Sequence, residues 1–320
     1  VRALRSSGSV PAGVVLEPRL VDVTGPMIDR LCVDEGPFDV ILGFAAAKHV
    51  RTERDAVSVL QMLNVNINGT LRSVQAVVSQ NPDAAVFVVS TDKAADPASL
   101  MGASKRLMEM VVLGSYPHAT TTRFANVAFS SGALLESWLI RLARRQVLPV
   151  PADTRRYFVS PEESGQLCAI ASVAPAGGVV VPQPGLVGSV ELLDALLAVL
   201  DSIGVRATVI NEGSVREGAG ELEISEDRWP VLLTTRDTAG EKGAEVFVGE
   251  RESARTWLPG LELIDSDFDA AEALEVAHWI SRQFEDPVPG ASLDEIEERM
   301  AKSIPNMQHV AGSARLDDRV

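Results

Sequence analysis

Stretches of continuous apolar residues alternate with stretches of helical periodicity along the first half of the chain. Residues 38–46 and 85–90 are apolar without a polar face, which is typical of strands covered on both sides in a parallel sheet. The alternation predicts a parallel α/β sheet with right-handed crossover connections. The expected strands are residues 19–23, 38–46, 85–90, 120–127 and 178–182; the expected helices are 27–32, 55–79, 103–113, 134–145, 162–174, 189–203, 270–284 and 293–303; residues 153–160 are expected to form a polar loop.

The composition indicates a folded protein and excludes several classes. The chain has 320 residues and is 46% hydrophobic, which argues for about two domains and against a mainly disordered chain. Its net charge of -15 offers no general attraction to nucleic acid or to an anionic membrane. No apolar run approaches the ~20 residues that span a bilayer, so we expect a cytoplasmic protein. Cys32 and Cys168 form no CxxC pair, so neither a metal site nor a disulfide framework is predicted.

The segment from Ser90 to Pro97, STDKAADP, carries the clearest candidate chemistry. It follows a predicted buried strand, and ligands of open parallel sheets bind just beyond the carboxyl ends of the strands. Asp92 and Lys93 are an adjacent acid and amine, which can donate and accept protons. Lys105 lies on the next predicted helix, one turn after Met101. From the residues alone, the same segment could equally be a surface turn with a helix cap.

This segment resembles the catalytic segment of extended short-chain dehydrogenase/reductases. More narrowly, it is similar to the polysaccharide-biosynthesis (CapD-like) family of UDP-N-acetylglucosamine 4,6-dehydratases and related epimerases. Motifs similar to those of this family follow in the same order along nearly the whole chain. They are GFAAAKHV at 43–50, VNINGT at 65–70, RFANV at 123–127, TRRYFVS at 154–160, RDTAGEK at 236–242 and the closing DEIEERMAKSIPN at 294–306.

The resemblance implies a Rossmann-like doubly wound parallel sheet with a smaller C-terminal substrate-binding domain. Residues 1–130 would form an incomplete NAD(P)-binding domain, residues 131–290 mainly the nucleotide-sugar domain, and residues 291–320 a closing helix and tail. Within the second range, residues 162–186 would return to the Rossmann sheet. The cofactor implied is NAD or NADP, the partner a nucleotide sugar, and the expected assembly a homo-oligomer.

One departure from the family concerns its opening GxxGxxG turn, whose following helix binds pyrophosphate. Nothing of this type precedes Asp22, so we expect an N-terminally truncated sheet that lacks about one βαβ unit of ~30 residues. A sheet that lacks its first strand exposes the edges of its neighbours. We therefore expect that the chain is a fragment, or that another segment or chain fills the gap.

The resemblance also assigns site residues by position. Lys105 would hold the nicotinamide ribose, Asn66 would support the site, and Arg156 would bind the diphosphate through charge-assisted bonds. In the alternative without function, Lys48 and His49 form a solvated turn, Asn126 caps a strand end and Arg156 is a surface cation. The cofactor-binding set is Asp22, Val23, Ala45, Ala46, Lys48, Asn66 and Lys105; the substrate-binding set is Lys48, His49, Thr91, Asn126 and Arg156; the catalytic set is Thr91, Asp92, Lys93 and Lys105.

A second departure is that Met101 stands where the usual Tyr-x-x-x-Lys pair has its tyrosine. A thioether cannot take a proton from a sugar hydroxyl, although some dehydratases of the family are similar in having Met there. The leading hypothesis is an NAD(P)-dependent nucleotide-sugar 4,6-dehydratase acting on UDP-N-acetylglucosamine. Lys93 would then remove the C5 proton, Asp92 would protonate the departing C6 hydroxyl, and Thr91 would orient the sugar. The alternatives are a nucleotide-sugar epimerase and a non-catalytic nucleotide-sugar-binding relic.

Overall fold

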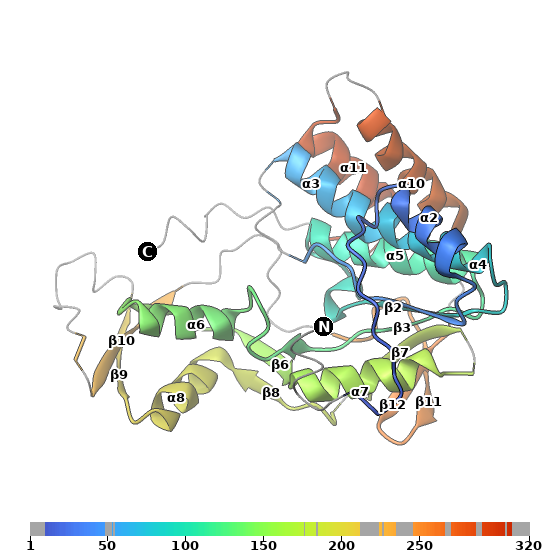
Figure 1. Cartoon of the computed structure of the whole chain (residues 1–320). Helices are drawn as coiled ribbons and strands as arrows, with labels where there is room; N and C mark the ends of the chain where they lie inside the picture. The colour runs from blue at the N-terminus through green and yellow to red at the C-terminus, as the bar shows by residue number, and fades with distance from the viewer. Residues whose placement is uncertain are drawn as a thin grey trace.

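The computed structural model describes residues 10–48, 53, 55–175, 177–183, 185–211, 224–225, 227–234, 246–265, 270–285, 290–304 and 306–308. A six-stranded sheet runs through the larger part of the molecule in the order β1-β2-β3-β7-β12-β11 (Figure 1). The first four strands are parallel, and the last two are antiparallel to their neighbours. Their bounds are β1 Val40–Gly43, β2 Ala85–Val89, β3 Thr120–Thr122, β7 Gly178–Pro182, β12 Leu261–Ile264 and β11 Ala254–Leu258.

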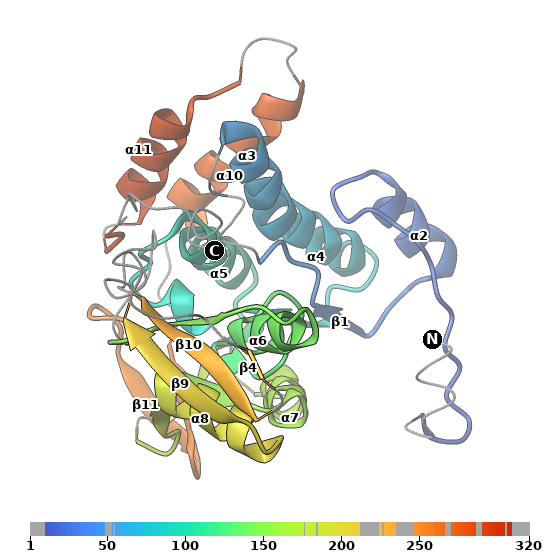
Figure 2. The ribbon, with the colours of Figure 1, turned by 90° about the vertical axis from the view of Figure 1, so that its left-hand side faces the viewer.

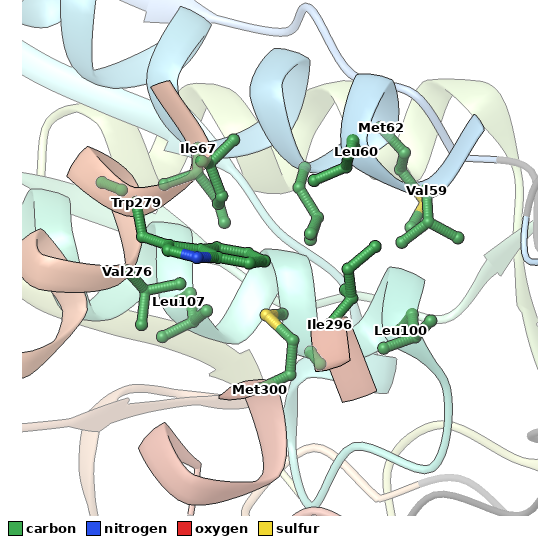
Figure 3. Close-up of a cluster of buried hydrophobic side chains, with 14 of the residues drawn as sticks. Val59, Leu60, Met62, Ile67, Leu100, Leu107, Val276, Trp279, Ile296 and Met300 are labelled. Carbon is green, nitrogen blue, oxygen red and sulfur yellow. The ribbon is translucent and has the colours of Figure 1, made fainter. Parts of the chain in front are cut away.

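Helices cover both faces of this sheet (Figure 1). On one face, α4 and α5 pack on the valine side chains of β2 and β7. On the other face, α7 packs on β2 and β3, with Cys168 and Ala171 against Phe87. A further layer, α10 and α11, packs on the first face, where Trp279, Ile296 and Met300 join one apolar cluster (Figure 3). The helices are α2 Met27–Glu35, α3 Ala56–Leu63, η2 Asn64–Gly69, α4 Thr70–Val78, η3 Asp92–Ala94, α5 Leu100–Ser115, α7 Pro161–Ser172, α10 Ala270–Glu285 and α11 Leu293–Ser303.

A smaller part of the molecule lies to one side of the main sheet (Figures 1 and 2). It holds two three-stranded sheets, β5-β10-β9 and β4-β6-β8, with helices α6 and α8. Its core is built around Trp138, Leu196 and Trp229. The bounds are β4 Asn126–Val127, α6 Leu134–Ala143, β5 Leu148–Pro151, β6 Arg155–Val159, β8 Ser189–Glu191, α8 Leu192–Ser202, β9 Arg206–Asn211 and β10 Arg228–Thr234.

The parallel sheet with helices on both faces confirms the predicted α/β class. Residues 162–186, which were predicted to return to the main sheet, contain β7, and β7 pairs with β3 of that sheet. However, β11 and β12 also belong to the main sheet, although they fall in the range predicted to be mainly substrate domain. The domain boundaries at residues 130 and 290 therefore stay a prediction.

Four expected elements differ from the observed ones because pairing, not local pattern, decides them. The expected helix 189–203 begins as strand β8, which pairs with β6, so that α8 starts only at Leu192. Residues 19–23 form no strand, since no described strand pairs with them. Residues 153–160 were expected to be a loop, but they contain β6, which pairs with β4 and β8. The expected strand 120–127 is two strands, because the chain leaves the main sheet after Thr122 and enters a different sheet at Asn126.

Strand β1 is open on one edge and exposed on one face, while Ile41 on the other face packs on buried apolar clusters. Among the described residues it pairs with β2 alone. Val40, Leu42 and Phe44 are 49%, 51% and 52% exposed, although the continuous apolar pattern predicted a strand covered on both sides. A cavity of about 310 Å³ lies beside this strand, lined by Leu42, Phe44, Val89 and Phe124 and by small residues of α7. In the part of the chain that the structure describes, no helix is long and apolar enough to cross a membrane.

Candidate functional site

The segment predicted to be catalytic leaves the carboxyl end of β2 as a single tight turn, η3, called the catalytic turn below. Thr91 begins this turn, with its hydroxyl oxygen accepting a hydrogen bond from the backbone N–H of Lys93 at 3.4 Å. Helix α5 packs closely against this turn at Gly102. A Cβ at this position would lie 2.4 Å from the carbonyl oxygen of Lys93, so the close approach requires glycine. The local sequence thus holds Asp92 and Lys93 at the edge of the sheet where ligands of open α/β folds bind.

Asp92, Lys93, Thr91 and Asn126 form one bonded cluster. The Oδ1 atom of Asp92 accepts from the Thr91 hydroxyl at 2.8 Å and from the Lys93 ammonium at 3.0 Å. The same ammonium donates to Asn126 Oδ1 at 3.2 Å, and Asn126 Nδ2 donates to the Tyr157 carbonyl at 3.2 Å. Asp92 is fully buried, and its Oδ2 accepts no hydrogen bond from the described residues. Leaving such an atom unpaired costs about 1–3 kcal/mol, so Oδ2 retains the capacity to accept a hydrogen bond, although the atom is closed to solvent in this structure.

Lys105 and Met101 lie on α5, and both side chains are buried. The Lys105 ammonium donates to the carbonyl oxygen of Val89, the last residue of β2, at 3.0 Å. Burial lowers the pKa of Lys105 to about 8, although the charge of Glu109 acts in the opposite direction. Met101 is 5% exposed and belongs to the main apolar cluster. The position of the usual tyrosine is therefore filled by a core side chain.

Asn66 joins the loop after β1 to α5. Its side-chain oxygen accepts from the Ala47 N–H at 2.7 Å, and its Nδ2 donates to the Ala47 carbonyl at 2.9 Å and to the Ser104 hydroxyl at 2.8 Å. This fixes the loop in which Ala45, Ala46 and Lys48 are exposed. Residue 49, the predicted substrate-binding histidine His49, lies outside the described residues.

Asp22 and Val23 lie in a loop that packs on η2. Asp22 Oδ1 accepts from the backbone N–H of Thr24 at 2.9 Å and from its hydroxyl at 2.8 Å, and these bonds lower the pKa of Asp22. A side chain on Gly69 would place its Cβ 2.9 Å from Val23 Cγ2, so the loop approaches the helix closely at a glycine. This contact brings the predicted adenine-binding residues to the helical stretch that also carries Asn66.

Arg156 lies on β6, beside the strand that carries Asn126. The register pairs Asn126 with Phe158, and alternate residues of a strand share a face, so Arg156 and Asn126 lie on the same face. Arg156 is half-buried, and its Nη1 donates to the Arg155 carbonyl at 2.8 Å. The structure therefore joins Thr91, Asp92, Lys93 and Asn126 directly. The roles assigned to these and the other site residues stay predictions.

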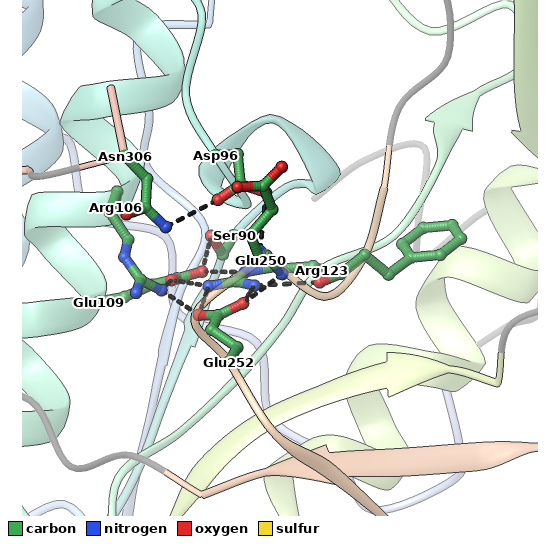
Figure 4. A network of polar contacts seen from close by, with 10 residues as sticks. Ser90, Asp96, Arg106, Glu109, Arg123, Glu250, Glu252 and Asn306 are labelled. Carbon is green, nitrogen blue, oxygen red and sulfur yellow. Dashed lines mark hydrogen bonds and ion pairs between the residues drawn. The ribbon is translucent and has the colours of Figure 1, made fainter. Parts of the chain in front are cut away.

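Sequence reasoning missed a buried ion network beneath the catalytic turn (Figure 4). Arg123 and Glu109 are both fully buried, and Arg123 Nη2 lies 2.6 Å from Glu109 Oε2. Arg123 also contacts Glu252 at 2.5 Å, and Arg106 forms a second ion pair with Glu252. Ser90 donates to Glu109 Oε1 at 2.5 Å. The RFANV motif contained Arg123, but nothing in the sequence near it signals its two acidic partners.

Burial and pairing act against each other at Glu252. Burial alone raises the pKa of a carboxylate. Here hydrogen bonds and charge from Arg123, with the charge of Arg106, outweigh burial and lower the pKa of Glu252 to about 2. Glu252 is therefore ionised near neutral pH, and the network supports Ser90 and the turn that follows.

Known protein sequences resemble this chain over part of its length. A sequence profile of the polysaccharide biosynthesis protein family matches residues 14–228. UDP-glucose 4-epimerase from Rickettsia conorii is 28% identical over 195 residues, which are 58% of this chain and 57% of that protein. Capsular polysaccharide biosynthesis protein CapD from Staphylococcus aureus is 28% identical over 149 residues, which are 44% of this chain and 25% of that protein. The match thus spans little more than half of the first relative and a quarter of the second.

Solved structures share the fold at low sequence identity. Pen from Bacillus thuringiensis has a TM-score of 0.61 at 19% identity, over 83% of this chain and 81% of that chain. The dTDP-glucose 4,6-dehydratase DesIV from Streptomyces venezuelae, solved with NAD bound, has a TM-score of 0.52 at 18% identity, over 83% and 79%. These identities show the fold alone, and they confirm the Rossmann-like class predicted from the sequence.

Proposed function

The chain belongs to the polysaccharide biosynthesis protein family, and we propose that it is an NAD(P)-dependent nucleotide-sugar 4,6-dehydratase acting on UDP-N-acetylglucosamine. The observation that carries this proposal is the Asp92–Lys93 pair, bonded at 3.0 Å at the ligand edge of the sheet. Elimination of water needs a base at one carbon and an acid at the next, and a single turn here supplies both groups. An epimerase needs no acid at C6.

Each residue of the cluster has a role in this proposal. With the proton of the 3.0 Å Asp92–Lys93 bond transferred to Asp92, the neutral amine of Lys93 removes the C5 proton, and Asn126, which lies 3.2 Å from the amine, holds it in place. Asp92 delivers a proton to the departing C6 hydroxyl through Oδ2, the oxygen without a partner among the described residues. Thr91 orients the sugar at C4. Arg156 binds the diphosphate from the neighbouring strand.

The residues present fit the two ends of a nicotinamide dinucleotide but not its pyrophosphate. When bound, this cofactor supplies reversible hydride transfer at C4 and C6 of the sugar. The apolar cavity of about 310 Å³, lined by Phe44, Val89 and Phe124 next to Thr91, suits a flat ring. Lys105 offers a cation at the end of β2, where its ammonium binds the Val89 carbonyl. Ala45 and Ala46 offer an exposed backbone, and Asp22 with Val23 would border the adenine. For the pyrophosphate, the described residues before Asp22 provide no glycine-rich turn between a strand and a following helix.

The proposal is tested by incubating the protein with UDP-N-acetylglucosamine and NAD or NADP. We expect a product lighter by one water in mass spectrometry, and no such product from Asp92→Asn. Intact substrate recovered with every UDP- and dTDP-hexose would contradict the dehydratase proposal.

A nucleotide-sugar epimerase is the second candidate, because the chain resembles a protein named UDP-glucose 4-epimerase over 195 residues. In the same incubation, a product of unchanged mass with inverted configuration at C4, seen by NMR, would select it. Binding of a UDP-hexose without any turnover would select a non-catalytic nucleotide-sugar-binding protein. The buried Met101 at the tyrosine position is the observation that supports this third reading.

A further inference from the structure

We propose that Asp96 is a positioning residue for the Asp92–Lys93 pair, and that it acts by fastening the turn that carries them to Asn306. This inference rests on the proposed function, since it names a residue that supports the same site. Asp96 belongs to none of the predicted catalytic or binding sets, and its side chain contacts neither Asp92 nor Lys93 directly.

The backbone at Asp96 adopts a conformation that few side chains accept. Its φ of 45° is one of three positive values among described non-glycine residues, and aspartate tolerates this region better than most residues. The bend directs the chain from η3 towards Pro97 and the start of α5. Both carboxylate oxygens are used, since Oδ1 accepts from Asn306 Nδ2 and Oδ2 accepts from the Glu250 N–H, each at 2.9 Å (Figure 4).

The segment following α11 is fastened to this bend a second time. The backbone N–H of Gln308 donates to the carbonyl oxygen of Pro97 at 2.9 Å. Asn306 and Gln308 thus bind two consecutive residues at the end of the catalytic turn, although they lie about 210 positions later in the chain. A side-chain bond and a backbone bond on neighbouring residues restrict both translation and rotation of the bend.

The loop from residue 247 to residue 252 holds the catalytic turn at both ends. Its Glu250 N–H binds Asp96 after the turn. Its Glu252 carboxylate binds Arg123, which reaches Ser90 before the turn through Glu109. Thr91, Asp92 and Lys93 lie between these two anchored positions, Ser90 and Asp96.

The same loop also reaches the partner of Asn126. The Phe247 ring packs on Tyr157 at a centroid distance of 5.5 Å, and the carbonyl of Tyr157 accepts from Asn126. Displacement of the bend at Asp96 would therefore change how Lys93 meets Asn126. A misplacement of about 1 Å can cost about 10²-fold in rate. Loss of the bond between Asp96 and Asn306 should therefore lower turnover, even though Asp96 does not contact the Asp92–Lys93 pair.

The test exchanges donor and acceptor between Asp96 and Asn306. Asn306→Asp sets two carboxylates against each other, and we expect kcat to fall at least about tenfold with KM changed less than about threefold. Asp96→Asn should have little effect, because its amide oxygen still accepts from Glu250 and Asn306 can rotate to present its own oxygen. The double variant Asp96→Asn/Asn306→Asp rebuilds the bond with reversed roles and should recover kcat to within about threefold of the parental value.

A second readout does not depend on turnover. The chain has five lysines, so reductive methylation with carbon-13 formaldehyde gives a short NMR spectrum in which Lys93→Arg identifies the Lys93 signal. We expect Asn306→Asp to shift the Lys93 signal or its pH titration, and the double variant to restore it. Asp265→Asn is the matched control, because it removes a carboxylate from an exposed ion pair with Arg255.

The two proposals fail in distinguishable ways. If the parental protein turns over no nucleotide sugar, the proposed function is wrong, while the Lys93 signal still tests the anchor. If folded Asn306→Asp leaves the Lys93 signal unchanged, or if the double variant fails to recover it, Asp96 does not position the pair.

Discussion

The ammonium group of Lys105 donates a hydrogen bond to the backbone carbonyl of Val89 at 3.0 Å. Val89 ends β2, and Ser90 and Thr91 follow it directly, so the bond ties α5 to the origin of the catalytic turn. Water is excluded from the amine, and burial lowers its pKa from 10.5 to about 8. Burial therefore disfavours the charged form of Lys105, so an uncharged side chain at this position would make folding more favourable.

Lys105→Met should stabilise the fold and weaken dinucleotide binding. The pKa of Lys105 is about 8 folded against 10.5 unfolded, so the unfolded chain binds more protons between these values and parental stability rises with pH through that window. The gain from Lys105→Met should reach up to about 3 kcal/mol below pH ~8 and shrink towards pH ~10. Urea unfolding at the two pH values measures it, with the exposed Lys302→Met as control. A gain that does not vary with pH would refute the explanation.

Lys93 and Lys105 should fail at different steps. Lys93→Ala should bind cofactor and substrate as the parental protein does but lose about 10²–10⁴-fold in removal of the C5 proton. Lys105→Ala should instead weaken dinucleotide binding. Solvent deuterium exchange into C5, together with titration of the dinucleotide, separates the two, and Lys302→Ala is the control. If Lys93→Ala exchanges C5 at the parental rate, another group is the base.

Local patterns predicted the elements whose burial depends on their own sequence. Strand β2 and helices α5 and α7 appear where apolar runs and helical spacing placed them. The expected helix 55–79 is also present, as α3, η2 and α4, although no spacing rule indicated the π-helical turn that carries Asn66. The sequence could single out residues 90–97 because they are consecutive, and their catalytic role stays a prediction.

Features that depend on distant partners were not predictable. Residues 19–23 have the composition of a strand, but no described strand pairs with them. Strand β1 has the composition of a strand covered on both sides, but among the described residues it pairs with β2 alone. Arg123 meets Glu252 from 129 positions away, and Asp96 meets Asn306 from 210 positions away. Side-chain pairing across such separations depends on the finished fold, and one sequence carries no periodic signal of it.

Glu252→Gln should destabilise the protein in a pH-dependent way. The pKa of Glu252 is lowered from 4.5 to about 2, so its stabilising effect is present above 4.5 and is lost as the pH falls towards 2. Removing this charge leaves the buried Arg123 with one acidic partner, which should cost about 3–5 kcal/mol near neutral pH. The cost should shrink as the solution is acidified. Chemical unfolding of both proteins from neutral pH down to about pH 3 measures the difference, and a constant offset would show that Glu252 acts only by packing.

Met101→Tyr should not improve the enzyme, although it restores the usual Tyr-x-x-x-Lys pattern with Lys105. Met101 is 5% exposed within the apolar cluster, so a phenol ring there has no open path to the bonded Asp92–Lys93 pair. The larger ring should cost about 1–3 kcal/mol through overpacking, and its hydroxyl adds a buried polar group. Met101→Leu, close in volume, should keep both stability and turnover. Denaturant unfolding and turnover of UDP-N-acetylglucosamine measure the two effects. A rise in turnover of about tenfold or more in Met101→Tyr at parental stability would mean that position 101 reaches the substrate and that proton transfer is not confined to Asp92 and Lys93.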